Sequence, residues 1–256
     1  MSDAMSDTPQ AKACIVVTGA SRGIGAAIAL ALAEQGHQVA CVSRSGGLPA
    51  VKAPPEVAAR WFAAKADVTD AWSLRTLFDH LARDGWRIAG LVNNAGFHVD
   101  APSNEVSMQE WQQVMDTNAT SVVSACQAAY PHLVKAGGGM IVNIGSFFEK
   151  LGVKRNLAYC ASKAAVGAIT RVLAVEWASK GIRVMNVAPG YIVTDLNADA
   201  MAAGGPLRAY LDKRIPGREP GKASDVGALV ATLFTPAGAF LTGETIYVDG
   251  GQGIAH

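Results

Sequence analysis

Cysteine is scarce in this 256-residue chain, and its four cysteines lie far apart. They are Cys14, Cys41, Cys126 and Cys160, and no two form a Cys-x-x-Cys pair, so neither a disulfide framework nor a zinc ribbon is indicated. The five histidines are scattered without ligand spacing, and no metal site is expected. We interpret the thiols as reduced and mostly buried, which favours a cytoplasmic location.

The chain also lacks an excess of charge and long apolar runs. Its 22 basic and 21 acidic residues leave a net charge of +1 without a basic cluster, which argues against nucleic acid as a partner. No apolar run reaches the roughly 18 residues of a membrane span, so no membrane association is expected. Residues 1–11 are polar and lack an apolar core. They are predicted to be a disordered tail, not a secretory signal, ahead of a single domain at 12–256.

A glycine-rich turn directly follows the first apolar run. Residues 13–18 are apolar and β-branched, as in a buried parallel strand, and residues 26–34 have helical composition. Glycine permits unusual backbone angles and lets main-chain amides approach a pyrophosphate at a helix N-terminus. A nucleotide site is therefore predicted, with a turn packed closely against its helix as the alternative. Its residues are Gly19, Ser21, Arg22, Gly23, Ile24 and Gly25.

An arginine stands where sites for NAD usually carry an acidic residue. The second predicted strand, within residues 37–43, is followed by Arg44 and ends in Ser43. An acid at this point would bind the ribose 2′-hydroxyl, whereas arginine accommodates a 2′-phosphate. Because Arg22 and Arg44 can both reach the adenosine end, NADP(H) is the predicted cofactor, with NAD(H) as the other candidate. The alternative is that both arginines are simply solvated.

Strands and helices alternate along the remaining chain, which predicts an α/β fold. We expect a doubly wound, Rossmann-type parallel sheet of about seven strands with helices on both faces. Ligands bind such sheets at the carboxyl ends of the strands, where further candidate cofactor residues fall: Asp67, Val68, Asn94, Ala95, Gly96, Pro189, Gly190, Ile192 and Thr194. Asp67 is a candidate acceptor for the adenine amino group or else a helix N-cap, and the Asn-Asn-Ala-Gly run is a crevice wall or a plain turn.

Three intervening segments carry specific expectations. Residues 46–57 contain three prolines and are predicted to be a loop. One long helix is predicted over residues 107–135, with Asn118 in its middle. Asparagine is a poor helix former, so it is expected there either because it faces solvent or because it bonds an active-site water. The last helix, residues 224–234, is predicted to be capped by Ser224 or Asp225.

Ser146, Tyr159 and Lys163 form the candidate catalytic group. If residues from about 156 onward are helical, Tyr159 and Lys163 lie one turn apart on one face. A tyrosine has a pKa of about 10, and a nearby ammonium group lowers that pKa, which suits proton transfer. Ser146 ends an apolar strand and can hold a substrate oxygen beside the tyrosine. The alternative is a chance Tyr-x-x-x-Lys pattern in an ordinary helix.

In this order the motifs resemble those of the short-chain dehydrogenase/reductase family. The resemblance covers essentially the whole chain beyond the N-terminal residues, including the thirteen-residue step from Ser146 to Tyr159. It implies that Tyr159 is the general acid or base and that Lys163 lowers its pKa and binds the nicotinamide ribose. It also implies that Ser146 orients the substrate oxygen and that Asn118 holds the water of a proton relay.

The same resemblance assigns the cofactor contacts. Residues 19 and 22–25 would surround the pyrophosphate. Asp67 and Asn94 would contact adenosine or support the adjoining strand, while Ile192 and Thr194 would contact the carboxamide and phosphates.

The implied activity is hydride transfer between NADP(H) and a small-molecule carbonyl or secondary alcohol. An NADPH-dependent carbonyl reductase leads. A 3-oxoacyl-carrier-protein reductase is a less favoured subtype, because Met140 stands where such enzymes often place a basic residue. A sugar or polyol dehydrogenase of gluconate 5-dehydrogenase type, using NAD(H), and a non-catalytic NADP(H)-binding sensor are the alternatives. By the same resemblance a homotetramer is expected.

Overall fold

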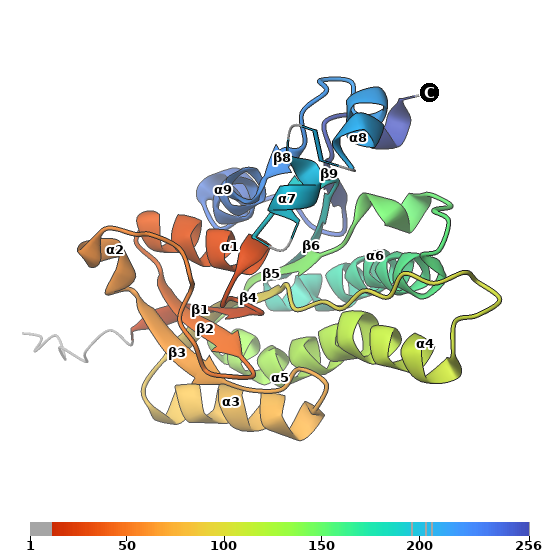
Figure 1. Ribbon diagram of the computed structural model, residues 1–256. Coiled ribbons are helices and arrows are strands. Elements are labelled where there is room, and N and C mark those ends of the chain that lie inside the picture. Colours follow the sequence, from red (N-terminus) through yellow and green to blue (C-terminus); the bar gives the residue numbers. More distant parts are fainter. Residues whose placement is uncertain (1–11, 196, 203, 206, 256) are drawn as a thin grey trace, which may run out of the picture.

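The fold is a seven-stranded parallel sheet covered by helices, seen in a computed structural model (Figure 1). The structure describes residues 12–195, 197–202, 204–205 and 207–255, so the predicted tail at 1–11 lies outside the described residues. The strand order is β3-β2-β1-β4-β5-β6-β9, and each neighbouring pair is parallel. The predicted α/β class, strand number and doubly wound arrangement are confirmed.

The elements begin and end close to the predicted positions. The strands of the main sheet are β1 Ala13–Thr18, β2 Gln38–Ser43, β3 Trp61–Lys65, β4 Arg87–Asn93, β5 Gly139–Ile144, β6 Ile182–Pro189 and β9 Thr245–Val248; β7 Ile192–Val193 and β8 Gly221–Lys222 form a separate pair. The helices are α1 Gly23–Glu34, α2 Pro55–Ala58, α3 Ala71–Arg83, α4 Met108–Met115, α5 Ser121–Lys135, α6 Leu157–Trp177, α7 Ala198–Met201, α8 Arg208–Arg214 and α9 Ala223–Leu233. Single helical turns lie at η1 Asp116–Thr120, η2 Phe147–Lys150, η3 Ala178–Lys180, η4 Pro236–Gly238 and η5 Gln252–Ile254.

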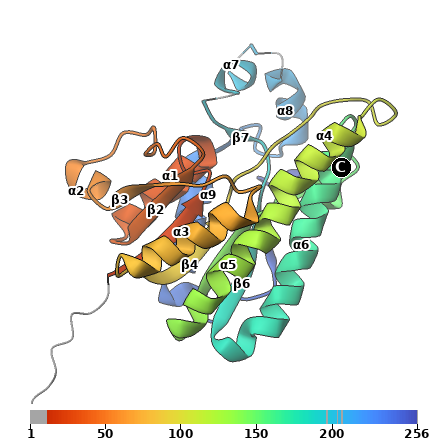
Figure 2. The same cartoon turned by 90° about the horizontal axis from the view of Figure 1, so that it is seen from below.

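Each face of the sheet has its own apolar core because successive strand residues point to opposite faces. In β1, Cys14 and Val16 pack under α3, α5 and α6, whereas Ile15 and Val17 pack under α1 and α9. Helices α3, α5 and α6 lie side by side in Figure 2. With both faces covered, the polar ends of the strands are left to form the site.

A chain of buried polar side chains ties α6 to the middle of the sheet. Asn93 Nδ2 donates to Asn143 Oδ1 at 2.9 Å, and Asn143 Nδ2 donates to Thr170 Oγ1 at 2.9 Å. Buried amides must be satisfied, and each such bond stabilises the fold by about 1 kcal/mol. These hydrogen bonds therefore fix the position of α6 relative to β4 and β5. Helix α6 carries Tyr159 and Lys163.

Three predicted segments need correction. The segment 46–57 is not all loop, because Pro54 and Pro55 stand at the start of α2, where a missing N–H costs nothing. The helix predicted over 107–135 is divided by the π-helical turn η1. In α9 the N-cap is Lys222, whose main-chain N–H donates to Asp225 Oδ2 at 2.8 Å.

Helix α6 together with η3, Leu157–Lys180, is long and apolar enough to cross a membrane by length and composition alone. It packs here against β5, β6 and η2, and 39% of its most apolar window is buried inside the protein.

Candidate active site

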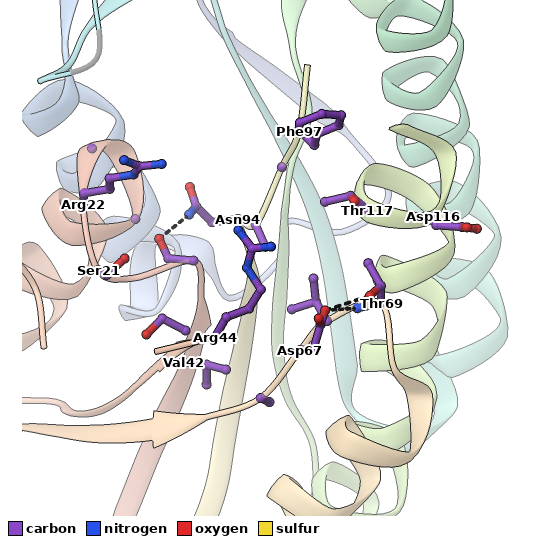
Figure 3. A pocket seen from close by; sticks show the side chains of 18 of the residues that line it. Ser21, Arg22, Val42, Arg44, Asp67, Thr69, Asn94, Phe97, Asp116 and Thr117 are labelled. Carbon is purple, nitrogen blue, oxygen red and sulfur yellow. Dashed lines mark hydrogen bonds between the residues drawn. The ribbon is translucent and has the colours of Figure 1, made fainter. Parts of the chain in front are cut away.

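A cleft of about 1140 Å³ lies along the carboxyl edge of the sheet. Figure 3 shows side chains from the segments that follow β1, β2, β3 and β4, and from η1, around this cleft. Most predicted cofactor residues line this cleft: Gly19, Ser21, Arg22, Gly23, Ile24, Gly25, Ser43, Arg44, Asp67, Val68, Asn94, Ala95, Gly96 and Thr194. The cleft therefore joins four strand ends that are far apart in the sequence.

The glycine turn is shaped by close backbone packing. Gly19 and Gly23 have φ values of 65° and 57°, which other residues rarely adopt. A Cβ built on Gly25 would lie 2.2 Å from the carbonyl oxygen of Gly19. Asn94 completes the turn, since its Nδ2 donates to the carbonyl oxygens of Thr18 at 3.0 Å and Gly19 at 3.1 Å. Asn94 was predicted either to contact adenosine or to support the adjoining strand, and these bonds support the strand.

The cleft also carries side chains of opposite charge. The Arg22 and Arg44 side chains both project into it (Figure 3). Asp67 accepts hydrogen bonds from the N–H and Oγ1 of Thr69, at 3.0 and 2.7 Å. These bonds, and to a smaller extent Arg44, lower the pKa of the Asp67 carboxyl group. Asp67 does not cap α3, because the N-cap is Asp70. Its carboxylate can therefore serve as an acceptor in the cleft.

Lys163 is a buried cation held by the main chain. Its side chain is 4% exposed, and Nζ donates to the carbonyl oxygen of Ile144 at 2.7 Å. None of the ion pairs found in the described part of the chain involves Lys163. Burial lowers its pKa from 10.5 to about 8, against an opposing effect of Glu149. A Cβ on Gly96 would lie 3.9 Å from Nζ, so Lys163 stands just behind the cleft wall.

Tyr159 and Ser146 lie beside Lys163, but the predicted effect on the tyrosine is wrong for this structure. Nζ of Lys163 is 5.7 Å from the centre of the Tyr159 ring. The pKa of Tyr159 is raised, mainly by burial, with a hydrogen bond from Ser146 acting in the opposite direction. Desolvation of the phenolate outweighs the hydrogen bond with Ser146. Tyr159 is thus a phenol that retains its proton at neutral pH.

Asn118 ties the loop after β4 to two helices. Its Oδ1 accepts from the N–H of Phe97 at 2.7 Å, and its Nδ2 donates to Phe97 O at 2.8 Å and Ser162 Oγ at 3.0 Å. The residue is 1% exposed, so the expectation of a solvent-facing asparagine is wrong. Every polar atom of the side chain is used, within a π-helical turn of the kind often found at functional sites.

Five predicted cofactor residues do not line the cleft: Tyr159 and Lys163, described above, and Pro189, Gly190 and Ile192. Ile192 is buried in the core under α9, and Gly190 packs against Asp249, which a Cβ would approach to 2.7 Å. Pro189 ends β6. These residues place the segment that carries Thr194, whose Cγ2 would lie 3.6 Å from a Cβ on Gly23.

Comparison with known proteins identifies the family to which this chain belongs. The family model described as enoyl-(acyl carrier protein) reductase matches residues 19–252. The chain is 33% identical, with a TM-score of 0.86, to a short-chain type dehydrogenase/reductase from Mycobacterium marinum, covering 95% of this chain and 96% of that one. The chain belongs to the short-chain dehydrogenase/reductase family.

Similar members of this short-chain dehydrogenase/reductase family differ in their substrates. A 3beta-hydroxysteroid dehydrogenase 1 from Eggerthella lenta is 37% identical, over 93% of this chain and 92% of its own. A 3-oxoacyl-[acyl-carrier-protein] reductase from Staphylococcus aureus is 36% identical, over 93% and 96%. A gluconate 5-dehydrogenase from Burkholderia cenocepacia, solved with NADP and tartrate, has a TM-score of 0.84 and 30% identity, over 96% of each chain. This protein is an NAD(P)-dependent oxidoreductase that acts on an alcohol or a carbonyl group.

Sequence reasoning missed one wall of this cleft. The wall comes from the loop after β4 and from α4 and η1, and it comprises Phe97, Gln109, Gln112, Gln113, Asp116 and Thr117. The glutamines and Asp116 recur at helical spacing, so they share one polar face. The pattern is visible in the sequence, but it resembles any solvated helix face until the strand ends are known to lie opposite.

Replacing Gly25 by alanine tests the close packing of the glycine turn. The added Cβ would collide with Gly19 O, so the turn must open and its amides move away from the cofactor. We expect NADPH affinity to fall roughly tenfold or more, measured by fluorescence titration. The control is Gly217→Ala, because nothing lies within 4 Å of a Cβ there. Unchanged affinity in Gly25→Ala would show that the turn does not hold the cofactor.

Proposed function

We propose that the protein is an NADP(H)-dependent carbonyl reductase in which Tyr159 gives its proton to the substrate oxygen. The observation that carries the proposal is the position of Lys163 and Asn118 directly behind Gly96. A Cβ on Gly96 would lie 3.5 Å from Asn118 Oδ1 and 3.9 Å from Lys163 Nζ, and Gly96 itself lines the cleft. Lys163 and Asn118 thus stand behind one wall of the cofactor cleft.

The residues fit a dinucleotide with a reactive nicotinamide. The glycine turn at the start of α1 suits a pyrophosphate, and Asp67 suits an adenine amino group. The bound cofactor supplies the hydride. Lys163 holds a positive charge where a phenolate forms on Tyr159, and Ser146 orients the substrate oxygen. Because the pKa of Tyr159 is raised, the enzyme holds the proton that reduction of a carbonyl needs. That Asn118 also holds a relay water stays a prediction.

The preference for NADP(H) over NAD(H) rests on two arginines. Arg22 and Arg44 come from different strand ends and both line the cleft. A 2′-phosphate between two guanidinium groups forms charge-assisted hydrogen bonds, which contribute more than neutral ones. Two of the similar structures were solved with NADP.

A second candidate substrate class is a polyol or hydroxy acid, because polar groups flank Tyr159. The His98 ring lies 5.2 Å from the Tyr159 ring, edge-on, and its Nε2 is hydrogen bonded to Asn156 Oδ1. Arg155 pairs with Asp100 in the same loop region. Phe148, on the other side of Tyr159 at 5.9 Å, favours an apolar ketone. A panel of ketones, 3-oxoacyl thioesters and sugar acids separates the two classes.

We propose a homotetramer in which α5 and α6 pack against a second copy. Val172 and Val175 on α6 are 54% and 81% exposed, and Val134 on α5 is 37% exposed. A run of exposed valines on neighbouring helices is typical of a covered face.

A cytoplasmic location is likewise proposed. Cys14, Cys41 and Cys126 are buried thiols whose pKa is raised to about 12, as suits unreactive, reduced cysteines.

Tyr159→Phe tests the general acid. The variant keeps the ring and loses the proton, so kcat should fall by roughly 10²–10⁴ while NADPH still binds. The measurement is NADPH oxidation with the best ketone of the panel. Near-normal turnover in the variant would remove the assignment.

Arg44→Ala tests the cofactor preference. We expect kcat/KM for NADPH to fall about 10- to 100-fold, as for loss of a hydrogen bond to a charged group, while kcat/KM for NADH changes little. The matched control is Arg75→Ala, since Arg75 is exposed on α3 and outside the cleft. An equal loss with both cofactors, or a wild-type preference for NADH, would contradict the proposal.

Val175→Glu tests the assembly. A charge inside an apolar interface carries a desolvation penalty, so the variant should elute as a smaller species than the wild-type tetramer in size-exclusion chromatography with light scattering. The control is Trp72→Glu on α3, where Trp72 is 73% exposed. A monomeric wild type would refute the tetramer, and an unchanged variant would refute the position of its interface.

A further inference from the structure

Glu149 lies close to the catalytic group but is absent from the motifs. It belongs to the short turn η2, three residues after Ser146, and it is partly buried. Its Oε2 accepts from Asn186 Nδ2 at 2.8 Å, and its Oε1 accepts from the Tyr247 hydroxyl at 2.9 Å. Both donors come from strands, β6 and β9. The carboxylate is therefore held in one position by two neutral donors from the sheet.

Two glycines leave room for this carboxylate. A Cβ on Gly145 would lie 3.0 Å from Oε2, and a Cβ on Gly167 would lie 3.5 Å from Oε1. Gly145 directly follows Ile144, whose carbonyl binds Lys163, and Gly167 lies one helical turn beyond Lys163 on α6. The carboxylate thus fills the space between the two segments that hold the Lys163 ammonium group.

We propose that Glu149 is a positioning residue whose fixed negative charge keeps Lys163 protonated while the substrate carbonyl is reduced. The inference rests on the proposed function, since it assigns Glu149 a role through Lys163 and Tyr159. No contact of Glu149 with substrate or cofactor is involved.

The surrounding charges support this role. Burial lowers the pKa of Lys163 to about 8, and among the described residues the charge of Glu149 acts to raise it. Around the carboxylate itself, Arg171 approaches from α6, Lys150 from η2 and Asp249 from the end of β9. Lys150 is engaged with the ring of Tyr247, 3.6 Å from its centre. Tyr247 has its pKa raised to about 12, by burial and then by Glu149, and so remains a neutral donor.

Glu149→Gln removes the charge and keeps the shape. Without that charge the pKa of Lys163 falls, so carbonyl reduction should be lost at lower pH than in the wild type. The measurement is kcat at saturating NADPH and ketone, followed from below neutrality into alkaline pH. In the plot of kcat against pH, we expect the alkaline limb, where activity falls, to move about 0.5–1 pH unit toward lower pH. Glu149→Asp, which retains a carboxylate, should move it less.

Two controls separate charge from structure. Glu176→Gln makes the same charge change on the exposed end of α6 and should leave the limb in place. Tyr247→Phe removes a hydrogen bond and retains the carboxylate, so it should also leave the limb in place. A limb that stays put in Glu149→Gln, or a move of the same size in Tyr247→Phe, overturns the inference. If Tyr159→Phe retains turnover, the proposed function itself has failed.

Discussion

The structure depends on keeping one ammonium group charged inside the protein. Lys163 is 4% exposed and donates to a main-chain carbonyl, Ile144 O, at the end of a central strand. A buried cation is costly unless polar groups surround it, so the local chain must supply them. The end of β5, the turn η2 and the first turns of α6 are arranged accordingly. The bonds from Asn93 through Asn143 to Thr170 hold α6 at the height this contact requires.

Burial shifts the pKa values of the two titrating groups in opposite directions, and its effect on Tyr159 favours reduction. It raises the pKa of Tyr159, so the phenol holds a proton, and it lowers the pKa of Lys163 toward neutrality. A phenolate forming during the reaction would then be stabilised by a nearby charge in a medium of low dielectric constant. The charge of Glu149 opposes the effect of burial on the pKa of Lys163.

Much of the fold followed from the sequence because strand, glycine turn and helix each have a local signature. The positions of Gly19, Arg44 and Gly96 at strand ends predicted the cleft, since parallel strands share one carboxyl edge. The π-helical turn at Asn118 had no local signature, because its cause is a long-range contact with Phe97 and Ser162. Elements beyond the strand ends were equally hidden. The glutamine face of α4 looks like any solvated helix face, and nothing local indicates that α4 forms a wall of the cleft. The expected lowering of the Tyr159 pKa was wrong because desolvation depends on packing, which spacing alone does not reveal.

The most direct test of this account is the titration of Lys163 itself. Protein labelled with ¹⁵N-lysine, with the Lys163 signal assigned by its loss in Lys163→Met, would be followed by heteronuclear NMR across alkaline pH. The account predicts that the ammonium group titrates at about 8, far below the ordinary value of 10.5. Titration at the ordinary value would show that the charge is solvated, and would contradict the claim that a buried ammonium group organises the site.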